Sequence, residues 1–362
     1  MSAKINSRQA GFIAFFILLG SAVTYMPESV AGRDAWISTL LAIPVGVGIL
    51  ALVIRVQNMF PGRHVLEISE MVLGRALGKL ANILYLGLLF ILAALYLYDL
   101  MILLHSVLLY ANKYYLYGVL VLASAYGVYM GVNAVARLVE LLMGLIMLFL
   151  LLAFFILIAC CADFSRLTPV MADLRPILAG FLYTANWPFA QASLLLMYLP
   201  LVVDLATGAK VIYRWYLIAA LILIIRSVLT VAVVGKELAL LSRYPLFEAF
   251  RLMRMGDFER IELFFFVLIF VCSLLALLLF YQGLALGMQK LFRLQEYRAI
   301  ILPLGLLLIS LSTYMFQSDL EMMFIETLLP FIMLPIHLLF PLLLFIGGKI
   351  YLKRQDKSLS AR

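Results

Sequence analysis

Charged residues are scarce in this chain of 362 residues, where Asp, Glu, Lys and Arg together make up only 13%. Soluble domains contain about 25% of such residues. Hydrophobic residues make up 66%, and the mean hydropathy is +1.12. The gaps between the apolar runs are too short for a separate soluble domain. The composition therefore predicts an all-α integral membrane protein that forms one membrane domain over residues 1–362.

Cysteine is equally sparse, and the motifs of common enzymes are missing. Cys160, Cys161 and Cys272 lie in apolar runs, where cysteine behaves as a small hydrophobic residue. An odd number without metal-ligand spacing gives no disulfide framework and no metal site. The sequence also lacks HExxH, GxSxG, a glycine-rich phosphate loop and a Cys/His cluster. We therefore expect no catalytic residues, no metal and no cofactor, and an enzyme is disfavoured.

Long apolar runs dominate the chain. A run of about 20 uncharged apolar residues can cross a bilayer as a helix. These runs predict about ten transmembrane helices, which use up nearly all of the sequence. They lie at residues 9–26, 35–54, 80–98, 114–136, 141–162, 176–203, 215–235, 263–289, 299–318 and 327–348, and the run 215–235 is interrupted only by Arg226.

Lys and Arg are distributed unevenly between the loops. If the N-terminus lies in the cytoplasm, most of the 27 Lys and Arg residues fall on the cytoplasmic side. An even helix count then places both termini there, with residues 349–362 as a basic tail. We interpret the net charge of +8 as topology and contact with the lipid bilayer, not nucleic-acid binding. The first run also fits a signal peptide, but this orientation requires it to be retained.

The first and sixth runs, called helix 1 and helix 6 below, are interrupted by small, polar and prolyl residues. Residues 21–27 read SAVTYMP, and residues 193–200 read SLLLMYLP. Amphipathic stretches containing Glu67 and Glu248 follow the second and seventh runs. Interruptions at corresponding positions indicate an inverted repeat, here of five helices at 9–162 and five at 176–348. Gly and Pro also occur in ordinary transmembrane helices, so either break alone fits a packing feature.

A break inside a membrane helix exposes backbone groups that can bind a ligand. Pro27 offers no N–H to the carbonyl of Val23, and Gly20 adds conformational freedom. Free N–H groups suit a carboxylate, and free carbonyls suit an ammonium. We therefore expect a small zwitterion, such as a free amino acid, at the bilayer midplane. The candidate ligand-binding residues are Gly20, Ser21, Ala22, Tyr98, Thr184, Asn186, Phe189, Gln191 and Tyr281.

Ionisable residues inside apolar runs are further candidates for function. Asp99 fits a proton or cation site inside the bundle, or a position near the outer surface. Arg226 needs a carboxylate or several carbonyls, and fits a structural ion pair or a ligand contact. His337 fits a hydrogen-bonded core histidine or a switch. Asp99, Arg226 and His337 are therefore candidates for an ion or proton pathway.

Several short motifs in the first eighty residues occur together. They are SRQ at 7–9, LLGSAVTYMP at 18–27, AGRDAW at 31–36, FPG at 60–62, LG at 73–74 and LGK at 77–79. In this combination the chain resembles the B subunit of spore germination receptors, the endospore germination permease family. That family is similar to the amino acid–polyamine–organocation transporter superfamily, so the resemblance implies a leucine-transporter-like fold with broken helices 1 and 6.

The resemblance implies a germinant-sensing receptor subunit of the spore inner membrane. It would bind a small germinant, often an L-amino acid, at Gly20, Ser21 and Ala22, and act with receptor A and C subunits. The stretch 31–36 would then be structural or partner-facing. Helix five, at 141–162, has no Lys, and 272–274 reads Cys-Ser-Leu without a Ser/Thr pair, which disfavours coupled transport. A proton-coupled or exchange amino-acid transporter and a membrane scaffold stay open as alternatives.

Overall fold

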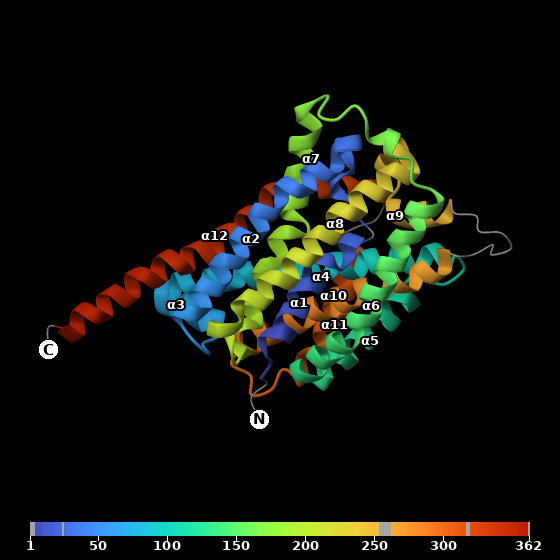
Figure 1. Cartoon of the computed structure of the whole chain (residues 1–362). Helices are drawn as coiled ribbons and strands as arrows, with labels where there is room; N and C mark the ends of the chain where they lie inside the picture. Colours follow the sequence, from blue (N-terminus) through green and yellow to red (C-terminus); the bar gives the residue numbers. More distant parts are fainter. Residues whose placement is uncertain (1–3, 24, 253–261, 316–318, 361–362) are drawn as a thin grey trace.

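The computed structural model describes residues 4–23, 25–252, 262–315 and 319–360, which are helical almost throughout (Figure 1). The α-helices are α1 (Ser7–Leu19), α2 (Ala35–Met59), α3 (Val65–Leu73), α4 (Arg75–Val107), α5 (Lys113–Met130), α6 (Val132–Cys160), α7 (Leu174–Asn186), α8 (Leu205–Leu241), α9 (Pro245–Arg251), α10 (Glu262–Leu291), α11 (Ile301–Met315) and α12 (Asp319–Ser360). Short 3₁₀ helices connect them: η1 (Ser21–Val23), η2 (Pro27–Asp34), η3 (Phe164–Leu167), η4 (Phe189–Met197), η5 (Leu199–Leu201) and η6 (Arg298–Ile300).

Seven helical stretches of the described chain are long and apolar enough to cross a membrane. They are Pro27–Met59, Arg75–Val107, Val132–Cys160, Leu205–Leu241, Phe265–Leu291, Arg298–Met315 and Thr327–Lys357. The apolar α1 is shorter because the helix breaks after Leu19. The predicted class, an all-helical integral membrane protein, is thus confirmed. The count of ten spans and the inverted repeat stay predictions.

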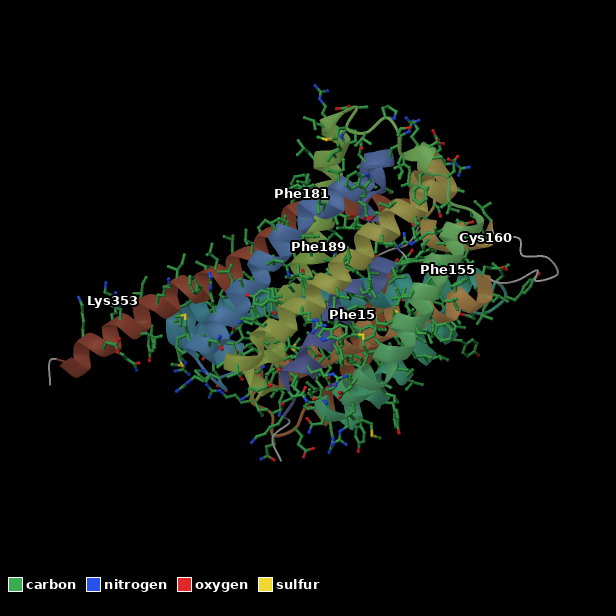
Figure 2. All side chains as sticks on the ribbon, viewed as in Figure 1. Phe15, Phe155, Cys160, Phe181, Phe189 and Lys353 are labelled. Carbon is green, nitrogen blue, oxygen red and sulfur yellow. The ribbon has the colours of Figure 1, made fainter. Side chains whose placement is uncertain are left out.

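Helix α1 runs through the middle of the bundle, while α5 and α6 form part of its outside (Figure 1). Helix α11 also carries exposed apolar side chains, such as Leu306. Every residue from Ala10 to Leu19 is buried, as expected for a helix that is apolar on all sides. Figure 2 shows Phe15 inside the bundle and Phe155 of α6 on its exterior, where 68% of Phe155 is exposed. Exposed apolar side chains on these outer helices form the surface that faces lipid.

The order of elements recurs along the chain. After the break in helix 1 come the long α2, the short α3 and the long α4, and after the break in helix 6 come the long α8, the short α9 and the long α10. The short helices are the two amphipathic stretches that contain Glu67 and Glu248. The same order of long and short helices thus follows both breaks, in line with the similar sequence patterns around them. The division into repeats 9–162 and 176–348 stays a prediction.

The AGRDAW stretch holds the loop that precedes α7. The Arg33 Nη1 donates to the carbonyl of Thr168 at 2.7 Å, and the Asp34 carboxylate accepts from the Met171 N–H at 2.9 Å. Gly32 has a φ of 58°, a left-handed conformation that a side chain would strain. These contacts give the stretch a structural role at the end of η2.

Helix α12 extends past the bundle at its C-terminal end (Figure 1). Its 42 residues span about 63 Å at about 1.5 Å per residue, twice the roughly 30 Å of a hydrocarbon core. Lys353 lies on the extension, as Figure 2 shows. The predicted basic tail at 349–362 therefore continues α12 as a helix through Ser360.

His64, which caps α3 outside the long apolar helices, gives a testable pH dependence. Its Nδ1 accepts from the Leu66 N–H at 3.3 Å, and only 9% of the residue is exposed. Burial, reinforced by the nearby Lys290 charge and partly offset by Glu67, lowers the pKa of His64 from 6.5 to about 4. Between these values only the unfolded chain takes up the proton, so stability should fall as pH drops from 6.5 to 4, by roughly 3 kcal/mol.

The His64→Asn variant keeps a capping acceptor and removes the titration. We expect its free energy of unfolding, measured by denaturant titration in lipid–detergent micelles at pH 7.5, 6 and 5, to fall less steeply with acid than that of the wild type. Equal slopes in the two proteins would show that His64 is not held neutral by the fold.

Candidate functional site

Helix 1 is broken where the sequence predicts. Helix α1 ends at Leu19, the N–H of Gly20 donates to the Phe16 carbonyl at 2.9 Å, and η2 starts at Pro27. A Cβ built on Gly20 would lie 2.4 Å from the Cβ of Ala276 in α10 and 3.5 Å from the Tyr96 ring. The chain at Gly20 therefore packs directly against α10. The predicted Ala22 is fully buried, whereas the side chain of Ser21 and the whole of Thr24 lie outside the described part.

Helix 6 is also interrupted. Helix α7 ends at Asn186, Trp187 is extended with φ −131° and ψ 111°, and η4 follows. Tyr96 of α4 joins this break, because its hydroxyl donates to the Gln191 Oε1 at 2.6 Å and its ring stacks on Trp187 at 4.8 Å. The two breaks are therefore linked through Tyr96, which lies next to Gly20 as well.

A small cavity, here called the central cavity, lies where both breaks meet α4 and α12. Its volume is about 30 Å³, which is enough for one or two water molecules but not for an amino acid. Two predicted residues, Asp99 and Asn186, line it. The full lining is Tyr25 and Pro27 from the helix 1 break, Leu95 and Asp99 from α4, Tyr183, Asn186 and Trp187 from the helix 6 break, and Leu329 and Pro330 from α12.

A larger cavity, the entrance cavity, adjoins the central one. It shares Tyr25, Pro27 and Tyr183 with the central cavity and has a volume of about 330 Å³, within the usual range for ligand pockets, roughly 300–1,000 Å³. Ser242 and Arg243 at the end of α8 also line it. It therefore lies toward the face opposite the N-terminus, which we call the far face.

Asp99 forms an ion pair between the two cavities. Its Oδ1 is 2.6 Å from the Nη2 of Arg243, and the exposed side-chain fractions are 10% for Asp99 and 17% for Arg243. The guanidinium also lies over the rings of Tyr98, at 5.9 Å, and of Tyr244, at 5.8 Å. The Tyr244 hydroxyl donates to the Asp99 carbonyl at 3.0 Å. The predicted Tyr98 therefore packs on the arginine that pairs with Asp99.

Arg226 forms a fully buried ion pair with Glu28. The guanidinium contacts the Glu28 Oε1, and a second nitrogen donates to the Tyr25 carbonyl at 3.4 Å. The Ser227 hydroxyl donates to the same Glu28 oxygen. Arg226 thus has both a carboxylate and a carbonyl as partners, and it ties η2, which follows the break in helix 1, to α8. The pair lies next to the central cavity, because Tyr25, which accepts from Arg226, also lines that cavity.

On the N-terminal face the start of helix 1 is hydrogen-bonded to the segment that precedes α8. The Ser7 N–H and Oγ both donate to the Asp204 carboxylate at 2.7 Å, and the Ile5 N–H donates to the Leu201 carbonyl at 3.0 Å. Asp204 precedes α8. These bonds join α1 to the start of α8.

Four other predicted residues do not line the central cavity: Thr184, Phe189, Tyr281 and His337. The Phe189 carbonyl accepts from the Tyr216 hydroxyl at 2.9 Å, and the Tyr281 hydroxyl donates to the Ile301 carbonyl between α10 and α11. The His337 Nδ1 is 2.6 Å from the Ser193 Oγ. Thr184 is fully buried near Asn186. Roles in ligand binding or ion movement for these residues stay predictions.

Several residues of the site carry no conspicuous sequence signal. Glu28 and Arg243 lie in loops or short helices, and only the structure shows that they pair with Arg226 and Asp99. No sequence motif points to Tyr183 or Trp187 as lining residues, although the pair Trp187-Pro188 stands at the helix 6 break. An aromatic beside a break-forming proline is the one signal that could have found Trp187.

The fold is similar to that of a solved membrane protein. The solved structure of MhsT in complex with L-phenylalanine matches this chain with a TM-score of 0.68 at 12% identity, and the match covers 97% of this chain and 89% of that chain. At this identity the match defines the fold alone. It confirms the predicted transporter-like fold.

The sequence comparisons identify the family. The family model described as "Spore germination protein" matches residues 4–320, and this chain therefore belongs to the spore germination permease family. It is also 28% identical, over 98% of its own length and 97% of the relative's, to spore germination protein KB of Bacillus subtilis strain 168. The predicted family is thus confirmed, and this family is a permease-like class of membrane proteins, not a class of enzymes.

Proposed function

We propose that this chain is the germinant-sensing membrane subunit of a spore germination receptor. It binds a free L-amino acid between the broken helices 1 and 6. The observation that carries this proposal is the central cavity, because both breaks line it together with Asp99 and Asn186. Membership of the germination family and the transporter-like fold support the same role.

The signal follows from a shift between two arrangements of the broken helices. A ligand moves such an equilibrium only as far as it binds one arrangement better than the other. In the described arrangement Ser7 bonds to Asp204 at the N-terminal face, and the central cavity is too small for an amino acid. The ligand would favour an arrangement with an enlarged cavity, which the receptor A and C subunits would sense.

The proposed setting is the spore inner membrane, with both termini in the cytoplasm and ten spans arranged as two inverted repeats of five. The far face, with the entrance cavity, is then the outer one. Charge distribution supports this orientation, since the helical extension of α12 carries Lys349, Lys353, Arg354 and Lys357 at the cytoplasmic side.

An amino-acid transporter is the second candidate, favoured by the likeness to MhsT. Purified protein in sealed proteoliposomes separates the two. We would add each of the twenty labelled L-amino acids, with and without a proton gradient, and count bound and accumulated label. A receptor should bind at least one of them saturably, at no more than one per protein, and accumulate none. Accumulation above that stoichiometry would establish a transporter, and no binding of any amino acid would overturn both candidates.

A further inference from the structure

The ion pair of Asp99 and Arg243 contacts both cavities. Asp99 lines the central cavity, and Arg243 lines the entrance cavity. Since the cavities share Tyr25, Pro27 and Tyr183, the pair stands at their boundary. Moving the two side chains apart would join a space of about 30 Å³ to one of about 330 Å³. The same movement would leave two nearly buried charges without each other.

Separating nearly buried charges of opposite sign costs free energy, unless a new charge of the opposite sign meets each of them. A free amino acid supplies both, because it carries an ammonium and a carboxylate at one end. We infer that Asp99 binds the α-ammonium and Arg243 the α-carboxylate of the ligand, which replaces their mutual ion pair with two new ones. This inference rests on the proposed function and names the residues that recognise the ligand's charges.

The surroundings of Asp99 suit an ammonium, and the chemistry of Arg243 suits a carboxylate. Asn186 lines the central cavity beside Asp99, is 96% buried, and its Oδ1 has no hydrogen-bond partner within the described chain. An ammonium has three protons to donate, so Asp99 and Asn186 can accept two of them. On the other side, Arg243 presents a planar guanidinium that can bind a carboxylate with two parallel hydrogen bonds.

The rings around Arg243 hold it in place for this role. The guanidinium lies 5.9 Å from the ring centroid of Tyr98, which belongs to α4, and 5.8 Å from that of Tyr244, which directly precedes α9. Such contacts favour a cation over an aromatic face. Tyr98 and Tyr244 are therefore positioning residues, which orient Arg243 toward Asp99 or toward a ligand carboxylate.

The remaining walls indicate the class of side chain. Tyr183 and Trp187 contribute rings, and Leu95, Leu329 and Pro330 contribute aliphatic surface. Asp99 is the one charged residue among those that line the central cavity in the described chain. An apolar side chain buries well against such walls, whereas a second charge would have no partner there. The ligand class is therefore an L-amino acid with an apolar side chain.

The test uses the full-length protein in lipid nanodiscs and equilibrium binding of labelled L-leucine and L-phenylalanine. Asp99→Asn and Arg243→Gln, alone and combined, should each weaken binding by about 30-fold or more, because a buried ligand charge loses its partner. L-Leucinamide and N-acetyl-L-leucine, which each lack one of the two charges, should bind the wild type at least tenfold more weakly than L-leucine. Glu67→Gln, which breaks the exposed Lys290 pair on the other face, is the matched control and should bind normally.

A purely structural ion pair predicts a different pattern. The single variants would then lose thermal stability, the double variant would recover it, and all would bind the amino acid with unchanged affinity. Unchanged affinity in the variants would overturn the inference while the proposed function stood. So would equal binding of L-leucine and its two derivatives, or binding of polar amino acids only. If none of the twenty amino acids bound the wild type, the proposed function itself would fail.

Discussion

Replacing Arg226 with Met should lower the free energy of unfolding by about 3–5 kcal/mol, the largest loss we expect from any single substitution. Glu28 is fully buried, and its Oε1 accepts from both Arg226 and Ser227. Without the guanidinium, a carboxylate stays buried with one hydroxyl as its partner. The double variant Glu28→Gln with Arg226→Met should recover most of the loss, because a buried pair can often be replaced by uncharged groups of similar size.

Denaturant titration in lipid–detergent micelles measures this difference. Arg251→Ala is the control, since Arg251 pairs with Glu248 three residues away and is 57% exposed, so that its loss should cost less than about 1 kcal/mol. If Arg226→Met were as mild as the control, the buried pair would not hold η2 to α8.

Replacing Gly20 with Ala should disturb the break in helix 1 and with it ligand binding. The new Cβ would lie 2.4 Å from that of Ala276 and 2.9 Å from the Phe16 carbonyl oxygen, so the break and α10 must move apart. Overpacking of this kind costs about 1–3 kcal/mol. Gly20→Leu should abolish the response to the amino acid altogether.

The double variant Gly20→Ala with Ala276→Gly removes the clash with α10 and should recover most of the stability and of the binding measured in nanodiscs. Gly48→Ala provides the control, because a Cβ built on Gly48 meets no atom within 4 Å. If Ala276→Gly rescued nothing while Gly20→Ala was harmful, the close contact of these two residues would not be what Gly20 provides.

The breaks could be predicted from the sequence because their causes are local. A proline removes one N–H wherever it stands, and Pro27 starts η2 in the structure, while Gly20 ends α1. The apolar runs likewise predict helices without knowledge of their neighbours. The family followed from short motifs close together in the first eighty residues, which the match over residues 4–320 confirms.

The partners of the buried charges could not be predicted, because they are distant in sequence. Arg226 and Glu28 are 198 residues apart, and Asp99 and Arg243 are 144 apart. Lining residues depend on the rotation of each helix about its axis, which packing decides. Tyr281 illustrates this, since its helix turns the hydroxyl toward Ile301 of α11. Asn186, at the end of α7, lines the central cavity as the break itself suggested.

Helix α8 is attached to the chain on both sides of the break in helix 1. Asp204, just before its first residue, holds Ser7, and Arg226 holds Glu28 about 33 Å further along, at about 1.5 Å per residue. No residue between these two points departs from helical geometry, since the kink in α8 comes later, at Gly235. If this rigid segment tilted about its middle, its two ends would move in opposite directions. Loosening at one face of the membrane and tightening at the other would then be a single motion.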